Sequence, residues 1–131
     1  MTANCESKLM DADVIVVRRS AFDGCVRAII DRADRHHPQP FAPLPMTNLA
    51  RRMSPTGFEY GYGGSGPAAL AHSILYACCG PLAADRWYGE FKWQYVAPAH
   101  GPCWTIKVGS VREWVRHQER LAQRQGKTHV R

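Results

Sequence analysis

A chain of 131 residues is long enough for one domain with a buried core, and its composition of 45% hydrophobic and 21% charged residues is ordinary for a globular protein. No apolar run reaches the roughly 20 residues that span a bilayer, and the first residues lack the basic end and apolar core of a secretory signal. We therefore expect a single cytoplasmic domain that does not contact a membrane.

The formal charge of +6 is unevenly distributed. Residues 1–106 carry ten basic and nine acidic side chains, whereas residues 107–131 carry seven basic and two acidic ones. The excess positive charge therefore belongs to the C-terminal segment.

The cysteines form an odd set of five with no C-x-x-C spacing, which argues against a disulfide framework and against a zinc site. We expect reduced thiols that are mostly buried, and neither a metal nor a cofactor. The set consists of Cys5, Cys25, Cys78, Cys79 and Cys103.

The N-terminal third predicts one strand and one helix. Residues 1–11 are polar and without a period, so we expect a frayed terminus. The β-branched run Val14–Val17 predicts a buried strand. Ser20 and Asp23 resemble a capping box, and apolar residues at helical spacing follow, so we predict a helix over residues 21–35.

Residues 36–46 contain four prolines and are predicted to form an extended surface loop. A proline-rich ligand for an aromatic groove is the alternative interpretation. The adjacent His36 and His37 fit a solvated loop better than a metal site, because neighbours in sequence rarely point the same way. Residues 47–53 predict a short helical turn.

The segment Gly57–Pro67, with the sequence G-F-E-Y-G-Y-G-G-S-G-P, predicts a sharp backbone bend followed by a helix. The helix beginning at Pro67 is apolar on nearly all sides, which predicts that it is the most buried one, and Gly80 with Pro81 should end it. We expect the glycines to let Phe58, Tyr60 and Tyr62 pack against this helix.

The same segment carries a candidate anion site, because free N–H groups and the helix dipole favour anions at a helix start. A match to the dinucleotide fingerprint is formal only, since a Gly-Pro stop precedes Asp85 in place of a second strand. The candidate residues are Gly61, Gly63, Gly64, Ser65 and Gly66.

Three further polar residues have competing interpretations. Ser65 fits a helix cap better than a nucleophile. Glu59, flanked by aromatic residues, is either a general acid or base or a carboxylate bonded to glycine amides. His72 lies within the apolar helix, where a hydrogen-bonded core histidine is expected before a catalytic one.

The following segment has two possible structures. With Asp85 as a cap, apolar residues at helical spacing favour a helix to about Ala97. The alternating order from Phe91 to Tyr95 also permits a strand, turned by residues 98–102 into a hairpin. Residues 104–108 predict a strand in both cases.

The C-terminal segment predicts an amphipathic helix that starts near Ser110, where Glu113 completes a capping box. It should run to about Gln125, with Gly126 just past its end and a basic tail over residues 126–131. Basic residues recur every four positions, which predicts a binding face for phosphates or, alternatively, a solvated face. The residues at this spacing are Arg112, Arg116, Arg120 and Arg124, and Lys127 lies beyond them on the same candidate binding face.

Together these elements predict a single small α+β domain, with three to four helices packed on a small sheet or hairpin and a glycine-rich turn before a buried central helix.

The sequence S-P-T-G-F-E-Y-G-Y-G-G-S-G-P-A-A-L-A, residues 54–71, resembles the family called domain of unknown function 6166, a set of small bacterial and phage proteins. Further similarity lies in F-K-W from Phe91, in W-T-I from Trp104 and in the helix at Val111. The chain departs from the family pattern at Tyr60 and Ala69, where a tryptophan and a glutamine are expected.

This resemblance implies a mobile-element origin without implying a reaction. Our leading hypothesis is a non-enzymatic interaction protein that binds a host or phage protein complex and acts as an inhibitor of a defence complex, of the anti-CRISPR type. The alternatives are a nucleic-acid-binding accessory protein that uses the basic helix, and an enzyme that binds an anion or nucleotide at the glycine segment.

Overall fold

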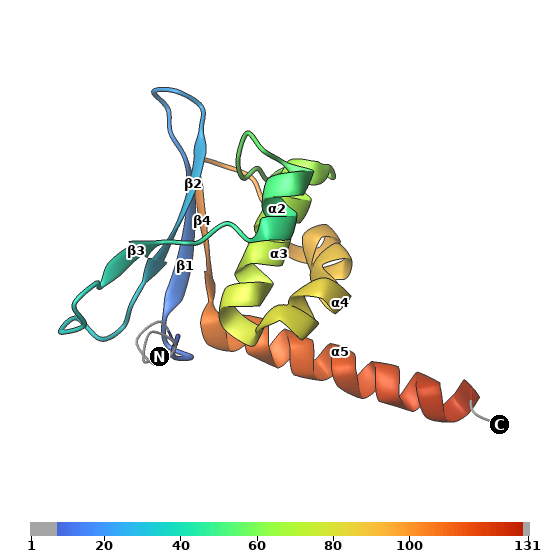
Figure 1. Cartoon of the computed structure of the whole chain (residues 1–131). Helices are drawn as coiled ribbons and strands as arrows, with labels where there is room; N and C mark the ends of the chain where they lie inside the picture. Colours follow the sequence, from blue (N-terminus) through green and yellow to red (C-terminus); the bar gives the residue numbers. More distant parts are fainter. Residues whose placement is uncertain (1–7, 130–131) are drawn as a thin grey trace.

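The β-branched and alternating segments of the chain form one four-stranded antiparallel sheet. In the computed structural model, which describes the backbone of residues 8–129 and the side chains of residues 8–125, the strand order is β3-β2-β1-β4 (Figure 1). The strands are β1 (Val14–Arg19), β2 (Val26–Asp31), β3 (Phe41–Pro43) and β4 (Cys103–Lys107). The strands predicted at residues 14–17 and 104–108 are confirmed, except that Val108 begins helix α5.

Alternation along the strands gives the sheet one buried and one open face. On β1, Ile15 and Val17 are fully buried, while Arg18 points to the solvent side. Ile15 pairs with Ile30 and Val17 with Ala28, so the buried rows continue across the sheet. All helices lie on this side of the sheet (Figure 1).

The helix predicted over residues 21–35 is wrong, because this segment forms a tight turn and strand β2. The Ser20 N–H donates to the Cys25 carbonyl at 2.9 Å, and Gly24 adopts a φ of 71°. The Ser20 hydroxyl accepts a hydrogen bond from the N–H of Asp23, as it would in a helix cap. Here this hydrogen bond lies in the turn of the hairpin formed by β1 and β2. Pairing with β1 overrides the helical spacing, and Phe22 is left 97% exposed.

The helices are α2 (Asn48–Met53), α3 (Ser65–Cys79), α4 (Pro81–Phe91) and α5 (Val108–His129). A π-helical turn, η1 (Lys92–Val96), extends α4. The helical alternative for residues 91–97 is therefore confirmed, as is the predicted helical turn at residues 47–53. With four helices and a four-stranded antiparallel sheet, the α+β prediction is confirmed.

Several predicted helix boundaries are wrong. Helix α3 begins at Ser65 with Gly64 as its N-cap, so Ser65 does not cap it through its side chain. Asp85 lies inside α4, because Gly80 has a φ of 95° and lets the chain turn directly from α3 into Pro81. Ser110 lies inside α5, since the backbone leaves β4 and enters this helix at once.

The ends of the chain and the proline-rich segment also differ from expectation. Leu9 is buried and the Gly109 N–H donates to the Asp11 carbonyl, so residues 8–11 are not frayed; residues 1–7 lie outside the described part. Residues 36–46 contain the edge strand β3. Helix α5 continues through Gly126 rather than ending before it.

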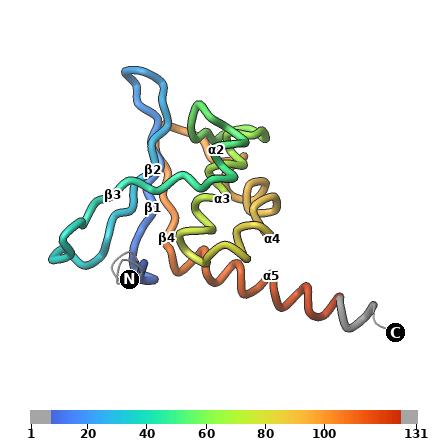
Figure 2. Tube along the Cα trace, viewed as in Figure 1, coloured from blue at the N-terminus to red at the C-terminus, as the bar shows by residue number. Residues whose placement is uncertain are grey.

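Helix α3 lies at the centre of the molecule, as predicted. All residues from Gly66 to Leu75 are buried, between the sheet on one side and α2, α4 and α5 around it. Helix α5 packs below this core and then projects beyond it toward the C-terminus (Figures 1 and 2). No helix in the described part of the chain combines the length and the apolar character that crossing a bilayer requires.

The cysteines are only partly buried, in contrast to the prediction. Cys78 is buried and Cys79 is half-buried, whereas Cys25 and Cys103 are exposed; Cys5 lies outside the described residues. Burial raises the pKa of the Cys78 thiol to about 12. Cys25 directly precedes β2 and Cys103 is the first residue of β4.

We expect iodoacetamide at about pH 8 to alkylate Cys25 and Cys103 well before Cys78, because alkylation needs an accessible thiolate. Timed quenching followed by peptide mass spectrometry measures the three rates. Unfolding in guanidinium should make the rates similar. Native-state labelling of Cys78 as fast as that of Cys25 would contradict the burial of this thiol.

Candidate functional site

The glycines between residues 63 and 66 create room for neighbouring side chains. The Trp93 ring occupies the place of a Cβ at Gly63, and a Cβ on Gly64 would lie 2.8 Å from the Tyr62 ring. At Gly66 the obstacle is Glu59, whose Cβ would be 2.7 Å away. Side chains therefore pack directly against the backbone of the glycine segment. The sequence analysis also predicted a packing role for these glycines.

Two of these side chains face the solvent. Trp93 is 62% exposed and Tyr62 is 52% exposed, although the prediction placed Tyr62 against the buried helix. Trp93 lies in η1, which also contains the fully buried Val96 and directly follows the fully buried Phe91. The Lys92 ammonium lies 4.4 Å from the centre of the Trp93 ring. We call Tyr62, Lys92 and Trp93 the aromatic surface.

Tyr60 holds the glycine segment, residues 57–67, against the core. This side chain is buried, and its hydroxyl donates to the Gly101 carbonyl at 2.6 Å. Its ring meets the Trp104 ring edge-on at 5.9 Å. A core tyrosine with a satisfied hydroxyl therefore joins the segment to β4.

Glu59 is paired with a cation. Its carboxylate accepts from the Arg19 guanidinium at 2.8 Å, and this hydrogen bond raises the Arg19 pKa. The same guanidinium lies 5.0 Å from the Tyr60 ring. Neither the proposed acid–base role nor the expected bonding of the Glu59 carboxylate to glycine amides has support in these contacts.

The candidate anion site formed by Gly61, Gly63, Gly64, Ser65 and Gly66 stays a prediction. The first turn of α3 has room for few ligand contacts, because side chains already lie against Gly63, Gly64 and Gly66. Pro67, the third residue of α3, also has no N–H to offer.

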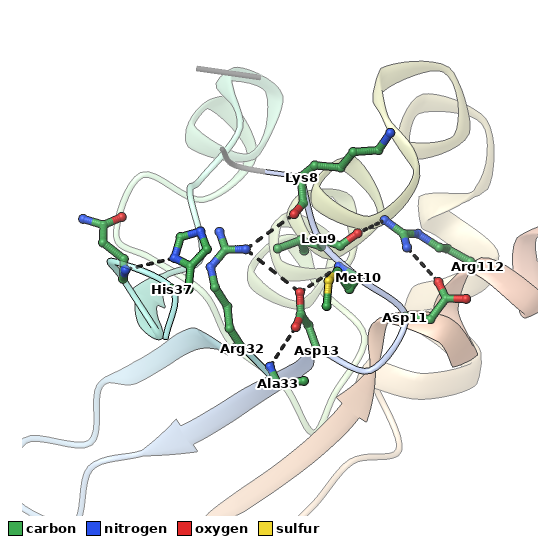
Figure 3. Close-up of polar contacts among 10 residues, drawn as sticks. Lys8, Leu9, Met10, Asp11, Asp13, Arg32, Ala33, His37 and Arg112 are labelled. Carbon is green, nitrogen blue, oxygen red and sulfur yellow. Dashed lines mark hydrogen bonds and ion pairs between the residues drawn. The ribbon is translucent and has the colours of Figure 1, made fainter. Parts of the chain in front are cut away.

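The basic stripe on α5 divides into two parts. Arg112 is largely buried and donates to the Cys78 carbonyl at 2.8 Å. It also donates to Asp11 at 2.7 Å and to the Leu9 carbonyl at 2.7 Å (Figure 3). All three guanidinium nitrogens are thereby used. This arginine fastens the N-terminal segment and the end of α3 to α5, so its contacts are structural.

The remaining arginines lie on the outer part of α5. The exposed Arg116 pairs with Glu113 at 2.8 Å, and Arg120 approaches the same carboxylate at 3.8 Å. These cations lower the Glu113 pKa, with the hydrogen bond from Arg116 as the largest cause. Arg124 follows one turn later, and the Lys127 side chain lies outside the described residues.

A hydroxyl, an imidazole and a carboxylate from three elements meet at His72, and sequence reasoning missed this cluster. His72 is 3% exposed; its Nδ1 lies 2.8 Å from the Thr47 hydroxyl and its Nε2 lies 2.8 Å from Asp85. The Thr47 hydroxyl also accepts from the Ala50 N–H as the cap of α2. Both ring nitrogens of His72 therefore have a hydrogen-bond partner.

The cluster joins α2, α3 and α4, so the prediction of a hydrogen-bonded core histidine is confirmed. Its members are separated by 25 and 13 residues, and no local pattern in the sequence predicts that they meet. Within the described part of the chain no three His, Cys, Asp or Glu residues are placed to hold a metal ion.

Replacing Asp85 with Ala should lower the free energy of unfolding by about 1 kcal/mol, because the buried Nε2 of His72 loses its acceptor. Urea denaturation measures the change. Glu90→Ala, which removes an exposed carboxylate from the same helix, is the control and should change stability by less than about 0.5 kcal/mol. Equal effects of the two variants would show that the His72 contact does not stabilise the fold.

In a comparison with protein families, residues 28–117 match a family of unknown function (DUF6166). The match covers more than half of the chain and includes all three residues of the aromatic surface. It begins at residue 28, well before residues 54–71, which carry the main resemblance in the sequence. Neither the curated proteins nor the solved structures contain a significant match. The chain belongs to this family of unknown function.

Proposed function

We propose that this member of the DUF6166 family is a non-enzymatic interaction protein that binds a partner protein through its aromatic surface. The observation that carries the proposal is the pair of large aromatic side chains, Tyr62 and Trp93, held in solvent against adjacent glycines.

An exposed tryptophan has an apolar face that water solvates poorly, and Trp, Tyr and Arg dominate the energetics of protein interfaces. A side chain that is already fixed before binding loses less conformational entropy on association. Gly63 and Gly64 provide that fixation here, because each accommodates one ring against the backbone. Lys92 beside Trp93 adds a cation at the rim of the surface.

The proposal has a more specific form. Resemblance to small bacterial and phage proteins supports a mobile-element origin, and such proteins often inhibit host machinery. In this form the partner is a host defence complex, such as CRISPR–Cas, and binding blocks its activity.

Trp93→Ala should weaken partner binding by about 30-fold, which corresponds to the roughly 2 kcal/mol typical of an interface hot spot. The tagged wild-type chain is used to isolate partners from host cells, and the affinity of the recovered complex is then measured with purified components. Gly63→Ala is expected to weaken the same complex, since the new Cβ displaces the Trp93 ring.

Phe22→Ala serves as the matched control, because Phe22 is an exposed aromatic residue outside the matched segment. The control should retain the partner. If Phe22→Ala and Trp93→Ala bind equally well, the aromatic surface is not the interface. Unchanged phage restriction when the wild-type protein is expressed would contradict the defence-inhibitor form of the proposal.

A nucleic-acid-binding role is the second candidate, and the outer part of α5 favours it. Residues 120–131 contain four basic and no acidic residues, and the described portion of this segment projects beyond the core (Figure 2). A projecting cationic helix can follow a phosphate backbone without a clash from the rest of the domain. In this role the basic residues set a salt-dependent affinity.

The double variant Arg116→Ala/Arg120→Ala should weaken binding to DNA or RNA and reduce the salt slope by about 2, because each phosphate contact contributes about 1. Gel retardation at several salt concentrations gives both values. Arg51→Ala/Arg52→Ala removes the same charge from the exposed face of α2 and is the control. Wild-type protein that retards neither nucleic acid at low salt would rule out this role.

A further inference from the structure

Strand β4 is an outer strand of the sheet, with β1 on one side and no strand on the other in the described part of the chain (Figure 1). The opposite edge is poorly suited to pairing. Its strand, β3, has only three residues and contains Pro43, with Pro40 directly before it and Pro45 close behind. β4 has five residues and no proline. Of the two edges, β4 is therefore the one that offers a continuous strand to a partner.

The hydrogen bonds at both ends of β4 show which of its residues face β1. The Arg19 N–H donates to the Pro102 carbonyl, and the Val108 N–H donates to the Asp13 carbonyl, each at 2.9 Å. Alternate residues of an antiparallel strand direct their backbone groups to opposite sides. The even-numbered residues of β4 are therefore bonded to β1, and the odd-numbered ones direct their N–H and C=O groups away from it.

The odd-numbered residues Cys103, Thr105 and Lys107 form the outer edge of the strand. Within the described part of the chain, no hydrogen bond joins the N–H or C=O of Cys103 and Thr105, or the N–H of Lys107, to another residue. All three residues are exposed. A row of exposed backbone donors and acceptors without partners is what an added strand pairs with.

The inward side chains of β4 are covered less completely than those of its neighbour. Ile15 and Val17 on β1 are fully buried. Their partners in register, Ile106 and Trp104, are only partly buried. An outer strand has a neighbour on one side only, which accounts for the difference. An added strand with apolar side chains beside Trp104 and Ile106 would bury this remaining apolar surface.

Cations lie at both ends of the strand on the other, open face of the sheet. Lys107 is the last residue of β4, and Arg18 lies beside Cys103 in the register of β1 and β4. Both cations are exposed, and neither forms an ion pair with a described residue. A second copy of this chain would add positive charge here, because the formal charge is +6. Acidic side chains at alternate positions of an added strand would instead be attracted to both cations.

We propose that β4 binds an extended acidic segment of a partner protein, which adds a fifth, antiparallel strand to the sheet. The backbone of the segment pairs with Cys103, Thr105 and the Lys107 N–H. Its apolar side chains cover Trp104 and Ile106, and its acidic side chains alternate with them on the face that carries the cations. This edge shares no residue with the aromatic surface, so the proposal goes beyond the proposed function and does not depend on it.

Synthetic peptides added to the ¹⁵N-labelled full chain test this edge by NMR. A blocked peptide in which valine and glutamate alternate should bind with a dissociation constant below about 1 mM. It should shift the amide signals of Cys103, Thr105 and Lys107. A peptide with lysine in place of glutamate should bind about tenfold more weakly or worse, because like charges then meet on the open face. Added salt should weaken binding of the glutamate peptide.

Methylation of the peptide backbone separates strand pairing from general charge attraction. In the proposed pairing the glutamates lie opposite Cys103 and Thr105 and donate their N–H groups to β4, whereas the valine N–H groups point away. N-methylation of the glutamates should therefore reduce the affinity about tenfold or more. N-methylation of the valines is the matched control and should reduce it by less than about threefold.

Two variants of the chain test the same edge from its own side. Thr105→Pro removes the central outward N–H and should weaken the glutamate peptide about tenfold, whereas Thr105→Val keeps this N–H and is its control. Lys107→Glu should weaken the peptide about fivefold. Arg52→Glu, at an exposed position of α2, changes the net charge equally and should have less than about a twofold effect.

The proposal is wrong if the glutamate peptide does not saturate, or if the lysine peptide binds equally well. Undiminished affinity after N-methylation of the glutamates, or in a folded Thr105→Pro, would also overturn it. If Thr105→Pro does not fold, the methylated peptides decide the question. A dimer in sedimentation experiments that shifts the same amides and competes with the peptide would show that a second copy, and not an acidic segment, occupies this edge.

Discussion

Helix α3 has no face that can be left in water, and the rest of the fold follows from its enclosure. Its residues from Gly66 to Leu75 are all buried, which requires a sheet on one side and other helices around the remainder. The hydrophobic effect rewards this enclosure at roughly 25 cal/mol per Å² of apolar surface. One sheet face is therefore covered, the other remains open, and α2, α4 and α5 are placed where they close the remaining sides.

A helix enclosed in this way needs special chemistry at both ends, where the backbone must reverse without a wide loop. At the start, small residues let the Glu59 and Tyr62 side chains fold against the incoming turn. At the end, Gly80 adopts a positive φ and passes the chain straight into α4. The exposed rings near the start are therefore a consequence of core geometry, because Trp93 and Tyr62 lie against Gly63 and Gly64.

A partly buried arginine, Arg112, and a buried one, Arg32, show how differently the fold treats cations. Arg112 has a partner for each guanidinium nitrogen and holds the N-terminal segment against α3 and α5. Arg32 lies in the same region, next to the same N-terminal segment, yet its Nε has no hydrogen-bond partner among the described residues and its Nη1 makes only long contacts, at 3.5 Å to the Lys8 carbonyl and 4.0 Å to Asp13. The same kind of side chain is thus fully hydrogen-bonded at one position and only weakly paired at the other.

The sequence by itself determined the α+β class, the strands at residues 14–17 and 104–108, the buried central helix and the packing role of the glycines, because each depends on local pattern or on residues close in the chain. Tertiary structure alone decided that Val26–Asp31 is a strand, since pairing with β1 outweighs a helical spacing of apolar residues. Tertiary structure alone also decided that Arg112 has structural contacts, unlike the other basic residues of α5. Asp11 and the Leu9 carbonyl, which accept its hydrogen bonds, come from the opposite end of the chain. The His72 cluster likewise depends on contacts between segments that are far apart in the chain. Local sequence patterns do not show which distant segments meet.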